Sequence, residues 1–571
     1  MNNKTENTTK QKPWVIVLLS LCIAGCANIV APTGGPKDTT PPRIVNEMPP
    51  NGKTNFTDNS IRIWFDEYIA LKNPQANILI SPIPSEKPEY RLKGKSLIIR
   101  FADSLLPNTT YSIFLGNAVA DITEGNLVPN YTYVFSSGTF LDSLAVEGRV
   151  FNGYDLSIPE NTYVMLYPAG SDSLIIKEAP RYIAKANNNG TYNINNIAEG
   201  TYQLIALQDM NKNFRYDPAD EAIAFLDTSI NIMPLFTVDK DTISTDSITT
   251  TIKSIIKQYV LPLSLTEDSI QRVLEAKNIG KERVRFIFRY PIDSYSITTT
   301  NDTLEDQIIW ELVETRDTLT GWLPLHNADS LTLFFNETSL TDTFFIALRE
   351  PFGLKGRTTK PTPWYDLSVK KNAKLRPGKP LYLICSEPVD KYDFANTLLI
   401  KDDKDTIPVD IILSDSVTMR RFLVSADFEH GAAYALSVPA NSFRSIRTYW
   451  NDTINYPFKI ADPDEYGKLI LQLNYEHTDS GNLMIQLFNS AGKIIDTKLP
   501  DKESMIVFDQ ILPGKYRIKA TLDRNKNMQW DAGNYWKRRQ PEKVTFMPAE
   551  ISIRANWEEE TMWEIRFTGY Q

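Results

Sequence analysis

The sequence predicts an all-β protein built as a string of β-sandwich domains. Its 571 residues are too many for one hydrophobic core, so several domains are expected. Short runs that alternate apolar and polar residues recur along the chain, as in residues 61–65, 96–101 and 131–135. Pro, Asn and Gly turns separate these runs at intervals typical of antiparallel sandwiches, and the chain lacks the organisation of a parallel α/β fold.

Residues 1–25 have the pattern of a lipoprotein signal peptide. Lys4, Lys10 and Lys12 precede an apolar stretch over residues 14–21, which is too short to cross a bilayer comfortably. Residues 23–26 (Ile-Ala-Gly-Cys) resemble the bacterial lipobox, which implies cleavage before Cys26 and acylation of its thiol by chains such as palmitate. Several acyl chains on one cysteine anchor a protein stably to a membrane. The alternative is an ordinary signal peptide that leaves Cys26 free.

The residues after Cys26 bear on location. Ala27 stands where inner-membrane retention often uses Asp, so the resemblance implies a lipid anchor in the outer membrane. Residues 28–37 lack the acidic cluster that resembles a surface-export signal, which favours the periplasmic face and leaves the cell surface as the alternative. Residues 26–40 are rich in Pro, Gly and Thr and predict a flexible tether.

Residues 41–140 predict the first sandwich. They resemble the bacterial Ig-like domain first described in surface-layer proteins, through Pro41-Pro42, residues 65–67 (Phe-Asp-Glu), residues 106–111 (Leu-Pro-Asn-Thr-Thr-Tyr) and residues 135–138 (Phe-Ser-Ser-Gly). With the lipobox and tether, this domain resembles an Ig-like lipoprotein family of Bacteroidota. That resemblance implies architecture and location but no settled activity.

Residues 143–235 predict a second, smaller sandwich. Residues 163–167 form an apolar run, and a Gly-x-Tyr edge at residues 190–192 leads into a long strand near residues 197–206. This pattern resembles transthyretin-like and Cna-B-like domains, which are common spacers in surface proteins.

An internal repeat predicts two further domains. Eight residues of the second sandwich recur 314 positions later: Ile197, Gly200, Tyr202, Ala206, Asp209, Asn211, Asn213 and Asp217 return as Ile511, Gly514, Tyr516, Ala520, Asp523, Asn525, Asn527 and Asp531. Residues 465–571 are therefore expected to form a second transthyretin-like sandwich. Upstream of it, residues 384–389 parallel residues 64–69, so residues 367–462 predict a second, divergent Ig-like domain.

The remaining stretch lies between the two copies. Residues 256–360 predict an additional β domain, with one short helix near residues 266–277. The Thr-, Ser- and Asp-rich run at residues 239–251 predicts a linker, because it lacks large apolar residues that could pack.

Composition and motifs argue against several function classes. A net charge of -9 and a pI near 5.3 give no basic surface for nucleic acid. Three cysteines are too few for a disulfide framework, and Cys385 lies in an apolar run typical of a buried strand. No nucleophile elbow, phosphate loop, dinucleotide fingerprint or zincin helix occurs in a convincing context. The sequence predicts a protein that is not an enzyme.

The repeated acidic loop predicts a calcium site. In the first copy, Asp209, Asn211, Asn213, Asp217 and Asp220 occupy positions 1, 3, 5, 9 and 12 of an EF-hand-like spacing, and Arg215 can offer its carbonyl at position 7. The loop also resembles the calcium loops of staphylococcal surface B-repeats. Two features depart from the EF-hand pattern: Phe214 replaces the turn glycine, and Asp220 replaces a bidentate Glu, although Glu221 is adjacent.

The second copy of this loop predicts weaker binding. It keeps Asp523, Asn525, Asn527 and Asp531, but Asn534 stands at position 12 and the charge is lower. For both copies the alternative is an Asx-rich turn that satisfies its own backbone.

Aromatic residues near the C-terminus form the last candidate site. Trp530, Tyr535 and Trp536, beside Arg538, are candidates for a platform that stacks glycan or docks a protein partner. The alternative is that these residues, with Trp557 and Trp563, are core and edge residues of the last sandwich.

Two functions fit these predictions. The first is a membrane-anchored scaffold or accessory protein that binds other envelope proteins. The second is a glycan-binding component of a polysaccharide-uptake or outer-membrane assembly system.

Overall fold

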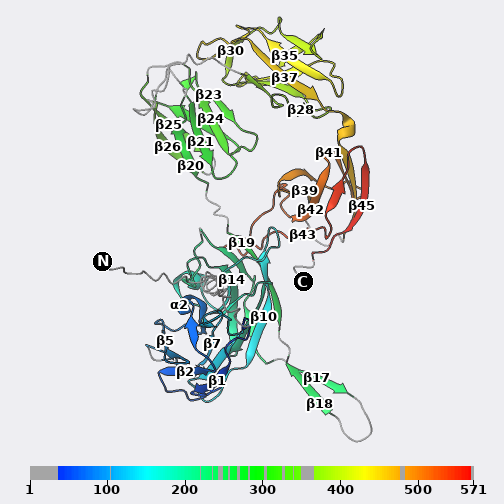
Figure 1. The fold of residues 1–571 in the computed structure, drawn as a ribbon. Coiled ribbons are helices and arrows are strands. Elements are labelled where there is room, and N and C mark those ends of the chain that lie inside the picture. Colours follow the sequence, from blue (N-terminus) through cyan, green and yellow to red (C-terminus); the bar gives the residue numbers. More distant parts are fainter. Residues whose placement is uncertain are drawn as a thin grey trace, which may run out of the picture.

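The computed structural model describes most of the chain after the tether. The described residues are 37–102, 105–218, 220–234, 236–241, 249–254, 257–266, 271–280, 283–300, 305–324, 328–337, 340–348, 365–475 and 482–567. The predicted signal peptide, Cys26 and nearly all of the predicted tether lie outside these residues. Within the described part, no helix is both long and apolar enough to cross a bilayer. Strands dominate it, which confirms the all-β prediction (Figure 1).

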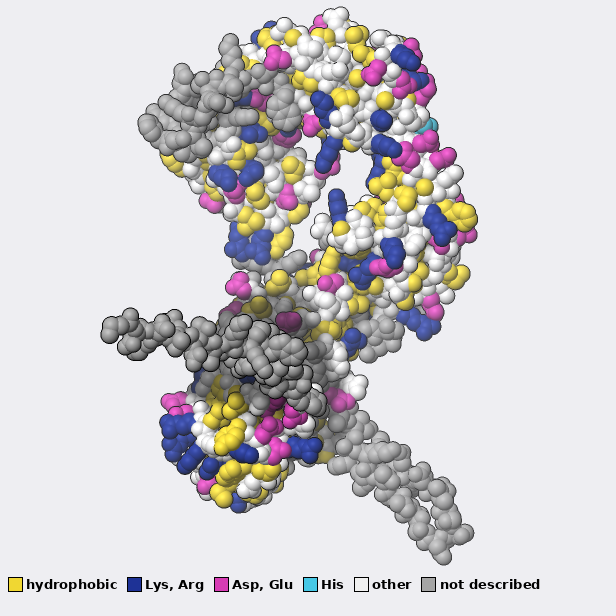
Figure 2. All heavy atoms as spheres, in the orientation of Figure 1, with side chains coloured by type: hydrophobic (Ala, Val, Ile, Leu, Met, Phe, Trp, Pro, Cys, Tyr) yellow, Lys and Arg dark blue, Asp and Glu magenta, His cyan; other side chains and the backbone are white. Residues whose placement is uncertain are grey.

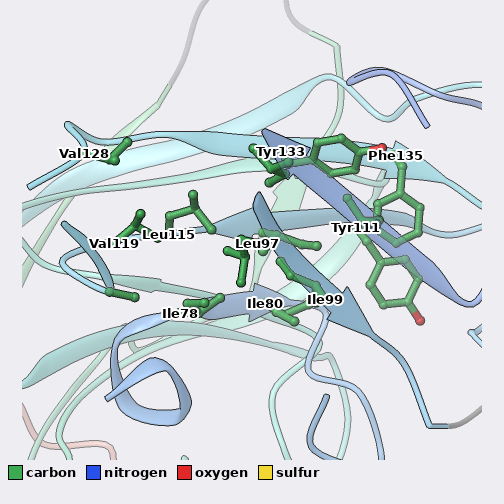
Figure 3. Packing of buried hydrophobic residues seen from close by; sticks show 14 of the residues in the cluster. Ile78, Ile80, Leu97, Ile99, Tyr111, Leu115, Val119, Val128, Tyr133 and Phe135 are labelled. Carbon is green, nitrogen blue, oxygen red and sulfur yellow. The ribbon is translucent and has the colours of Figure 1, made fainter. Parts of the chain in front are cut away.

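The first sandwich packs two sheets around one core. One sheet has the order β1-β2-β6-β5, the other has the order β4-β7-β9, and β3 pairs with β8. Figure 3 shows Leu97 and Ile99 near Tyr111, Tyr133 and Phe135 in this core. The strands are β1 (Ile44–Met48), β2 (Ser60–Phe65), β3 (Ile69–Leu71), β4 (Leu79–Ser81), β5 (Glu89–Leu92), β6 (Ser96–Arg100), β7 (Thr110–Phe114), β8 (Val119–Asp121) and β9 (Thr132–Ser136), with one helical turn, α2 (Pro74–Asn77).

The second sandwich is an eight-stranded sheet. Its strands follow the order β12-β11-β14-β15-β19-β10-β13, and β16 pairs with β14. The bounds are β10 (Leu144–Asn152), β11 (Thr162–Pro168), β12 (Tyr182–Lys185), β13 (Thr191–Ile197), β14 (Gly200–Gln208), β15 (Ala222–Phe225), β16 (Ile230–Ile232) and β19 (Gln258–Leu265), with the helical turn α3 (Leu174–Lys177).

The boundary of this second sandwich lies later than the sequence predicted. Strand β19 pairs in parallel with β10 and antiparallel with β15, and its Leu261 and Leu263 are buried in the core. The domain therefore ends near Leu265 and not at residue 235, and the next domain does not begin at residue 256. Local sequence placed the boundary wrongly because the pairing of β19 joins segments more than a hundred residues apart.

The described residues at the two ends of the predicted linker, 239–241 and 249–251, belong to paired strands. Strands β17 (Phe236–Asp241) and β18 (Thr249–Ser254) pair antiparallel and project from the second sandwich (Figure 1). The Thr-rich composition of this run, which indicated that it has no core of its own, is compatible with strands because threonine favours extended backbone.

The third sandwich contains sheets of order β20-β21-β24-β23 and β22-β25-β26. The helix predicted near residues 266–277 is wrong for residues 273–277, because these belong to β20, which forms a ladder with β21. The strands are β20 (Val273–Asn278), β21 (Arg283–Phe288), β22 (Tyr295–Thr299), β23 (Ile309–Leu312), β24 (Thr318–Trp322), β25 (Ser330–Glu337) and β26 (Leu340–Ala347).

The fourth sandwich covers the region predicted as a second Ig-like domain. Its main sheets have the orders β27-β29-β34-β33 and β28-β37-β35-β31-β32. Cys385 is a fully buried free thiol here, and burial raises its pKa to about 12, which disfavours the reactive thiolate. The strands are β27 (Tyr365–Leu367), β28 (Lys374–Leu375), β29 (Leu381–Cys385), β30 (Val389–Tyr392), β31 (Leu398–Lys401), β32 (Asp405–Ile407), β33 (Asp410–Leu413), β34 (Arg421–Ser425), β35 (Ala433–Val438), β36 (Phe443–Ser445) and β37 (Ile454–Ile460).

The fifth sandwich repeats the topology of the second. The pairings of Ile205 with Phe225 and Leu207 with Ile223 recur as Lys519 with Phe546 and Thr521 with Val544. The parallel pair β10–β19 recurs as β38–β45. The strands are β38 (Gly467–Asn474), β39 (Asn482–Asn489), β40 (Ile494–Lys498), β41 (Met505–Ile511), β42 (Gly514–Asp523), β43 (Val544–Phe546), β44 (Ile551–Ile553) and β45 (Glu558–Glu564).

Polar contacts join the neighbouring sandwiches. Arg420 of the fourth places a guanidinium nitrogen 2.6 Å from a carboxylate oxygen of Glu311 in the third, and its guanidinium lies over the ring of Trp322. The amide of Gln510 in the fifth donates to the carbonyl of Pro377 in the fourth at 3.0 Å. The fifth sandwich then returns to the second, so the chain from the second to the fifth closes on itself (Figures 1 and 2).

Candidate functional site

The first acidic loop follows β14 and is held by its own side chains. Asp209 is fully buried, and its two carboxylate oxygens accept the backbone N–H groups of Lys212 at 2.6 Å and Phe214 at 2.8 Å. Asp217 Oδ2 accepts the side-chain amides of Asn211 at 2.6 Å and Asn213 at 3.0 Å.

Glu221 closes the base of this loop. Its carboxylate accepts the backbone N–H of Met210 at 3.2 Å and that of Asp217 at 3.1 Å. Burial, with Asp209 and Asp217 nearby, raises the pKa of Glu221 to about 7. Asp220, the residue predicted at position 12, is exposed, whereas Glu221 is buried.

The second acidic loop, after β42, repeats this network. The carboxylate of Asp523 accepts the N–H groups of Lys526 and Met528, and Asp531 accepts the amides of Asn525 and Asn527. Glu542 takes the role of Glu221, since its carboxylate accepts the N–H groups of Arg524 and Asp531. Asn534, which stands at position 12 by spacing, instead exchanges backbone hydrogen bonds with Arg539.

EF-hand spacing did not point to the glutamate whose carboxylate accepts loop N–H groups in each copy, Glu221 in the first and Glu542 in the second. The signal that locates it is the internal repeat itself: Glu221 follows Asp217 by four positions, whereas Glu542 follows Asp531 by eleven, so the second copy carries seven extra residues (11 − 4 = 7).

The left-handed backbone at position 6 of these loops needs no glycine. Phe214 has φ 56° and Met528 has φ 62°, the conformation that a glycine adopts most readily. Phe214 is held by an edge-to-face contact with Tyr163, 5.2 Å between ring centroids. Among the residues that the structure describes, no three His, Cys, Asp or Glu side chains gather as a metal site. Calcium binding by either loop stays a prediction.

The seven extra residues of the second copy lie in a segment that we call the clasp loop, residues 532–541. It leaves the fifth sandwich and packs against the second. Tyr535 at its tip is fully buried in a cluster formed by the outer face of β11, β14 and β15, where its ring meets that of Phe225 edge-to-face at 5.3 Å.

Hydrogen bonds fix the clasp loop on the second sandwich. Gly533 N–H donates to Ser264 Oγ at 2.9 Å, and a Cβ on Gly533 would lie 2.9 Å from that oxygen, so a larger residue would crowd the contact. The amide of Gln540 donates to the carbonyl of Phe225 at 2.9 Å. Arg538 forms an ion pair with Asp172. Asn534 is buried within the loop and bonds to the backbone of Arg539 through its own backbone.

A second contact between the same two sandwiches buries polar groups. Tyr154 of the second sandwich lies under the ammonium of Lys519, 3.5 Å from the nitrogen to the ring centroid, and edge-to-face against Trp530. Lys519 is fully buried on β42, directly opposite Gln486 on β39, and burial lowers its pKa to about 8. Within the part of the chain that the structure describes, Nζ of Lys519, Oε1 of Gln486 and Oγ1 of Thr521 have no hydrogen-bond partner.

The predicted aromatic platform is not formed. Tyr535 is buried against the outer face of the second sandwich, Arg538 is paired with Asp172, and Trp530 donates its indole N–H to the carbonyl of Glu542 at 2.9 Å. Trp536 is 45% exposed and Trp563 is buried in its own core. The sequence left open an external ligand or the core and edge of the last sandwich: Trp563 lies in that core, whereas Tyr535 packs against the second sandwich.

A sequence signal for that partner surface existed. Residues 163–167 (Tyr-Val-Met-Leu-Tyr) are apolar or aromatic at consecutive positions, and six of the seven residues of Thr162–Pro168 are buried. Since alternate strand residues face opposite sides, such a run predicts a strand covered on both faces.

A comparison with family models gives one match. The bacterial Ig-like domain family matches residues 38–137, the first sandwich. A search of curated proteins finds no match to the chain.

Solved structures provide fold-level likenesses only. The major pilin subunit of Bacillus cereus is 10% identical, with 74% of this chain and 99% of that chain covered and a TM-score of 0.14. The surface-layer protein rSbsC is 10% identical over 84% of this chain and 64% of that chain, with a TM-score of 0.13. A Bacteroides ovatus protein, SGBP-B of a mixed-linkage glucan utilization locus, solved with a mixed-linkage heptasaccharide, is 8% identical over 71% and 93%, with a TM-score of 0.17. Similarity at this level says nothing about the function of this chain.

Proposed function

We propose that this chain is a non-enzymatic lipoprotein of the outer membrane, anchored by acylated Cys26, that acts as a scaffold or accessory binding protein for other envelope proteins. The Ig-like first sandwich, together with the lipobox and tether in the sequence, supports a Bacteroidota-type envelope lipoprotein. The periplasmic face of the outer membrane is the proposed location, on the composition of residues 28–37.

The observation that carries the scaffold role is the contact between the second and fifth sandwiches. Domains that are connected only by linkers would reorient freely relative to one another, since interfaces between domains are often small. Here a fully buried tyrosine, an ion pair and backbone hydrogen bonds hold together segments that lie about three hundred residues apart in the sequence. Such a closed arrangement presents its outer surfaces in one fixed geometry, which a scaffold requires.

The anchor is tested by Cys26→Ser. Acylation requires the thiol, so the variant is expected to leave the membrane fraction or to stay uncleaved. Fractionation and intact-mass measurement of the mature protein would check both. Normal processing together with unchanged membrane association would refute the lipoprotein proposal. Protease added to intact cells tests the face: the periplasmic proposal expects protection, and cleavage would place the protein on the surface.

The scaffold role is tested by cross-linking in the native envelope, followed by identification of the partners by mass spectrometry. Wild type is compared with Tyr535→Ala, which removes the buried ring, and with Trp536→Ala, an exposed neighbour on the same loop, as the matched control. We expect reproducible envelope-protein partners that are lost in the first variant and kept in the second. Two results would contradict a scaffold that depends on the closed arrangement: no cross-linked partner at all, or the same partners for Tyr535→Ala as for wild type.

A further inference from the structure

A cleft of about 510 Å³ lies where the first and second sandwiches meet. The first sandwich lines it with Phe114 and Asn117, at the end of β7, and with Asn130. The second sandwich lines it with Tyr163 of β11, Lys185 of β12 and Asn188 in the turn between β12 and β13. Its size falls within the range of about 300–1,000 Å³ typical of ligand sites, which often lie at domain boundaries.

The two walls of the cleft are fixed relative to each other. Ile183 N–H donates to Ser81 Oγ at 3.1 Å, and Ser112 Oγ donates to Asn196 Oδ1 at 3.0 Å, each bond joining the two sandwiches. Leu79 and Ile83 of the first sandwich also pack against the apolar cluster on the outer face of β11 and β14. A ligand would meet a preformed site and would not have to order it, which lowers the cost of binding.

The lining is rich in amides and holds no carboxylate among the described residues. Six asparagines line it: Asn77, Asn117, Asn130, Asn187, Asn188 and Asn189. Asn117, Asn130 and Asn188 are exposed, and their side chains form no hydrogen bond within the described chain. Each free amide offers two donors and one acceptor with two lone pairs.

This donor and acceptor pattern matches a particular ligand chemistry. A sugar hydroxyl both donates and accepts, so it pairs with a neutral amide in either direction, whereas a cation would need carboxylates and a phosphate would need several positive charges. The half-buried ring of Phe114 adds an apolar surface on which the C–H face of a sugar ring can rest. Lys185 is the single cation in the lining, 6.0 Å from the ring centroid of Tyr163, and is placed to meet one carboxylate of an acidic sugar.

We propose that this cleft between the first and second sandwiches binds an oligosaccharide, through the free amides of Asn117, Asn130 and Asn188. The site is distinct from the clasp loop and does not depend on the scaffold role. Binding a glycan would tie the anchored chain to a polysaccharide of the envelope or its surroundings.

The test is isothermal titration of the full-length chain, purified in detergent, with cellohexaose, xylohexaose, mannohexaose and hexagalacturonate. We expect saturable binding of at least one of these probes. Asn117→Ala with Asn188→Ala should weaken it about ten-fold or more, since two amides lose their hydrogen bonds to the sugar. The matched control is Asn59→Ala, at an exposed asparagine that does not line the cleft, and this variant should bind like wild type. Lys185→Gln should weaken hexagalacturonate and leave the neutral probes unchanged.

Two outcomes would overturn the proposal: none of the four probes binds at millimolar concentration, or the double variant binds as tightly as wild type. The three asparagines are exposed, so unfolding of the variants is not expected, and circular dichroism of each variant verifies this. Because the clasp loop is untouched, failure here leaves the scaffold proposal standing.

Discussion

Lys519 shows how the context of one residue differs between the two copies of the repeat. Its counterpart in the second sandwich, Ile205, lies in an apolar cluster, whereas the ammonium of Lys519 lies over the ring of Tyr154 and has no hydrogen-bond partner among the described residues. Burial disfavours the charged amine, so Lys519 opposes folding of this region while it is protonated. The cation–π contact with Tyr154 offsets part of that cost.

A pH prediction follows for Lys519. Its pKa is about 8 in the folded chain, against an ordinary lysine value of 10.5 in the unfolded chain, so the unfolded chain binds more protons between these values. Stability should therefore rise with pH from about 8 to 10.5, and the full penalty of up to about 3 kcal/mol should act below pH 8. Urea unfolding at pH 7.5 and 9.5 checks this: relative to Lys519→Met, wild type should gain about 2 kcal/mol. If the free energy of unfolding changed with pH equally in wild type and in Lys519→Met, the burial of the Lys519 charge would be contradicted.

At the scale of elements, the two acidic loops share one hydrogen-bond pattern, and each closes on a buried glutamate. That pattern is the self-satisfied Asx turn which the sequence left as the alternative to calcium. It does not decide between the two, because the same oxygens can serve a cation. The carboxylates of Glu221 and Glu542, which directly precede β15 and lie just before β43, accept the backbone N–H groups of Asp217 and Asp531 and so tie each loop to the start of the next strand.

Calcium binding by the first loop predicts proton release. The pKa of Glu221 is about 7, so the group is largely protonated at pH 6.5, and a bound cation would favour its charged form. Calorimetry of the full chain with calcium at pH 6.5, in two buffers of different ionisation enthalpy, should give heats that differ by the protons released. Asp209→Ala should abolish this signal and Asp523→Ala should keep it. Absence of any heat at millimolar calcium would leave the loops as structural turns.

The position of β19 predicts where the chain can be divided. A fragment of residues 38–266 contains the complete second sandwich and should unfold cooperatively. A fragment of residues 38–235 lacks β19, so it loses two fully buried leucines, roughly 3–6 kcal/mol of burial, and leaves β10 and β15 with open edges. Thermal unfolding by circular dichroism compares the two. Equal melting temperatures would show that β19 is dispensable and that a boundary at residue 235 is right.

At the scale of the whole molecule, the second sandwich is the hub. Its sheet packs its own core on one face, and on the other face it receives the first sandwich and the clasp loop. This explains why strands β11 and β14 are buried at consecutive positions.

Opening of the closed arrangement is predicted for Tyr535→Ala. Removal of a fully buried aromatic ring costs about 3–5 kcal/mol, which is a large loss beside the roughly 5–15 kcal/mol that stabilises a whole native protein. Small-angle X-ray scattering should then report a larger radius of gyration. Trp536→Ala, at an exposed position on the same loop, should leave the scattering curve unchanged. A compact Tyr535→Ala would mean that the contact around Tyr154 and Lys519 holds the arrangement alone.

The sequence by itself determined the all-β class, the Ig-like first sandwich and the duplication of the small sandwich. Alternation of apolar residues and turn chemistry act locally, and the repeat is visible as identical residues at one offset, so these features need no tertiary information. EF-hand spacing did not point to Glu221 and Glu542, whose carboxylates accept backbone N–H groups of the two acidic loops.

Only the tertiary structure decided which segments meet. The pairing of β19 with β10 and the packing of Tyr535 against the outer face of the second sandwich both join residues that are distant in the chain. An aromatic residue carries the same hydrophobicity whether its partner is another molecule, its own core or a neighbouring domain. The choice among these depends on the shape and polarity of the surface it meets, and local sequence does not contain that surface.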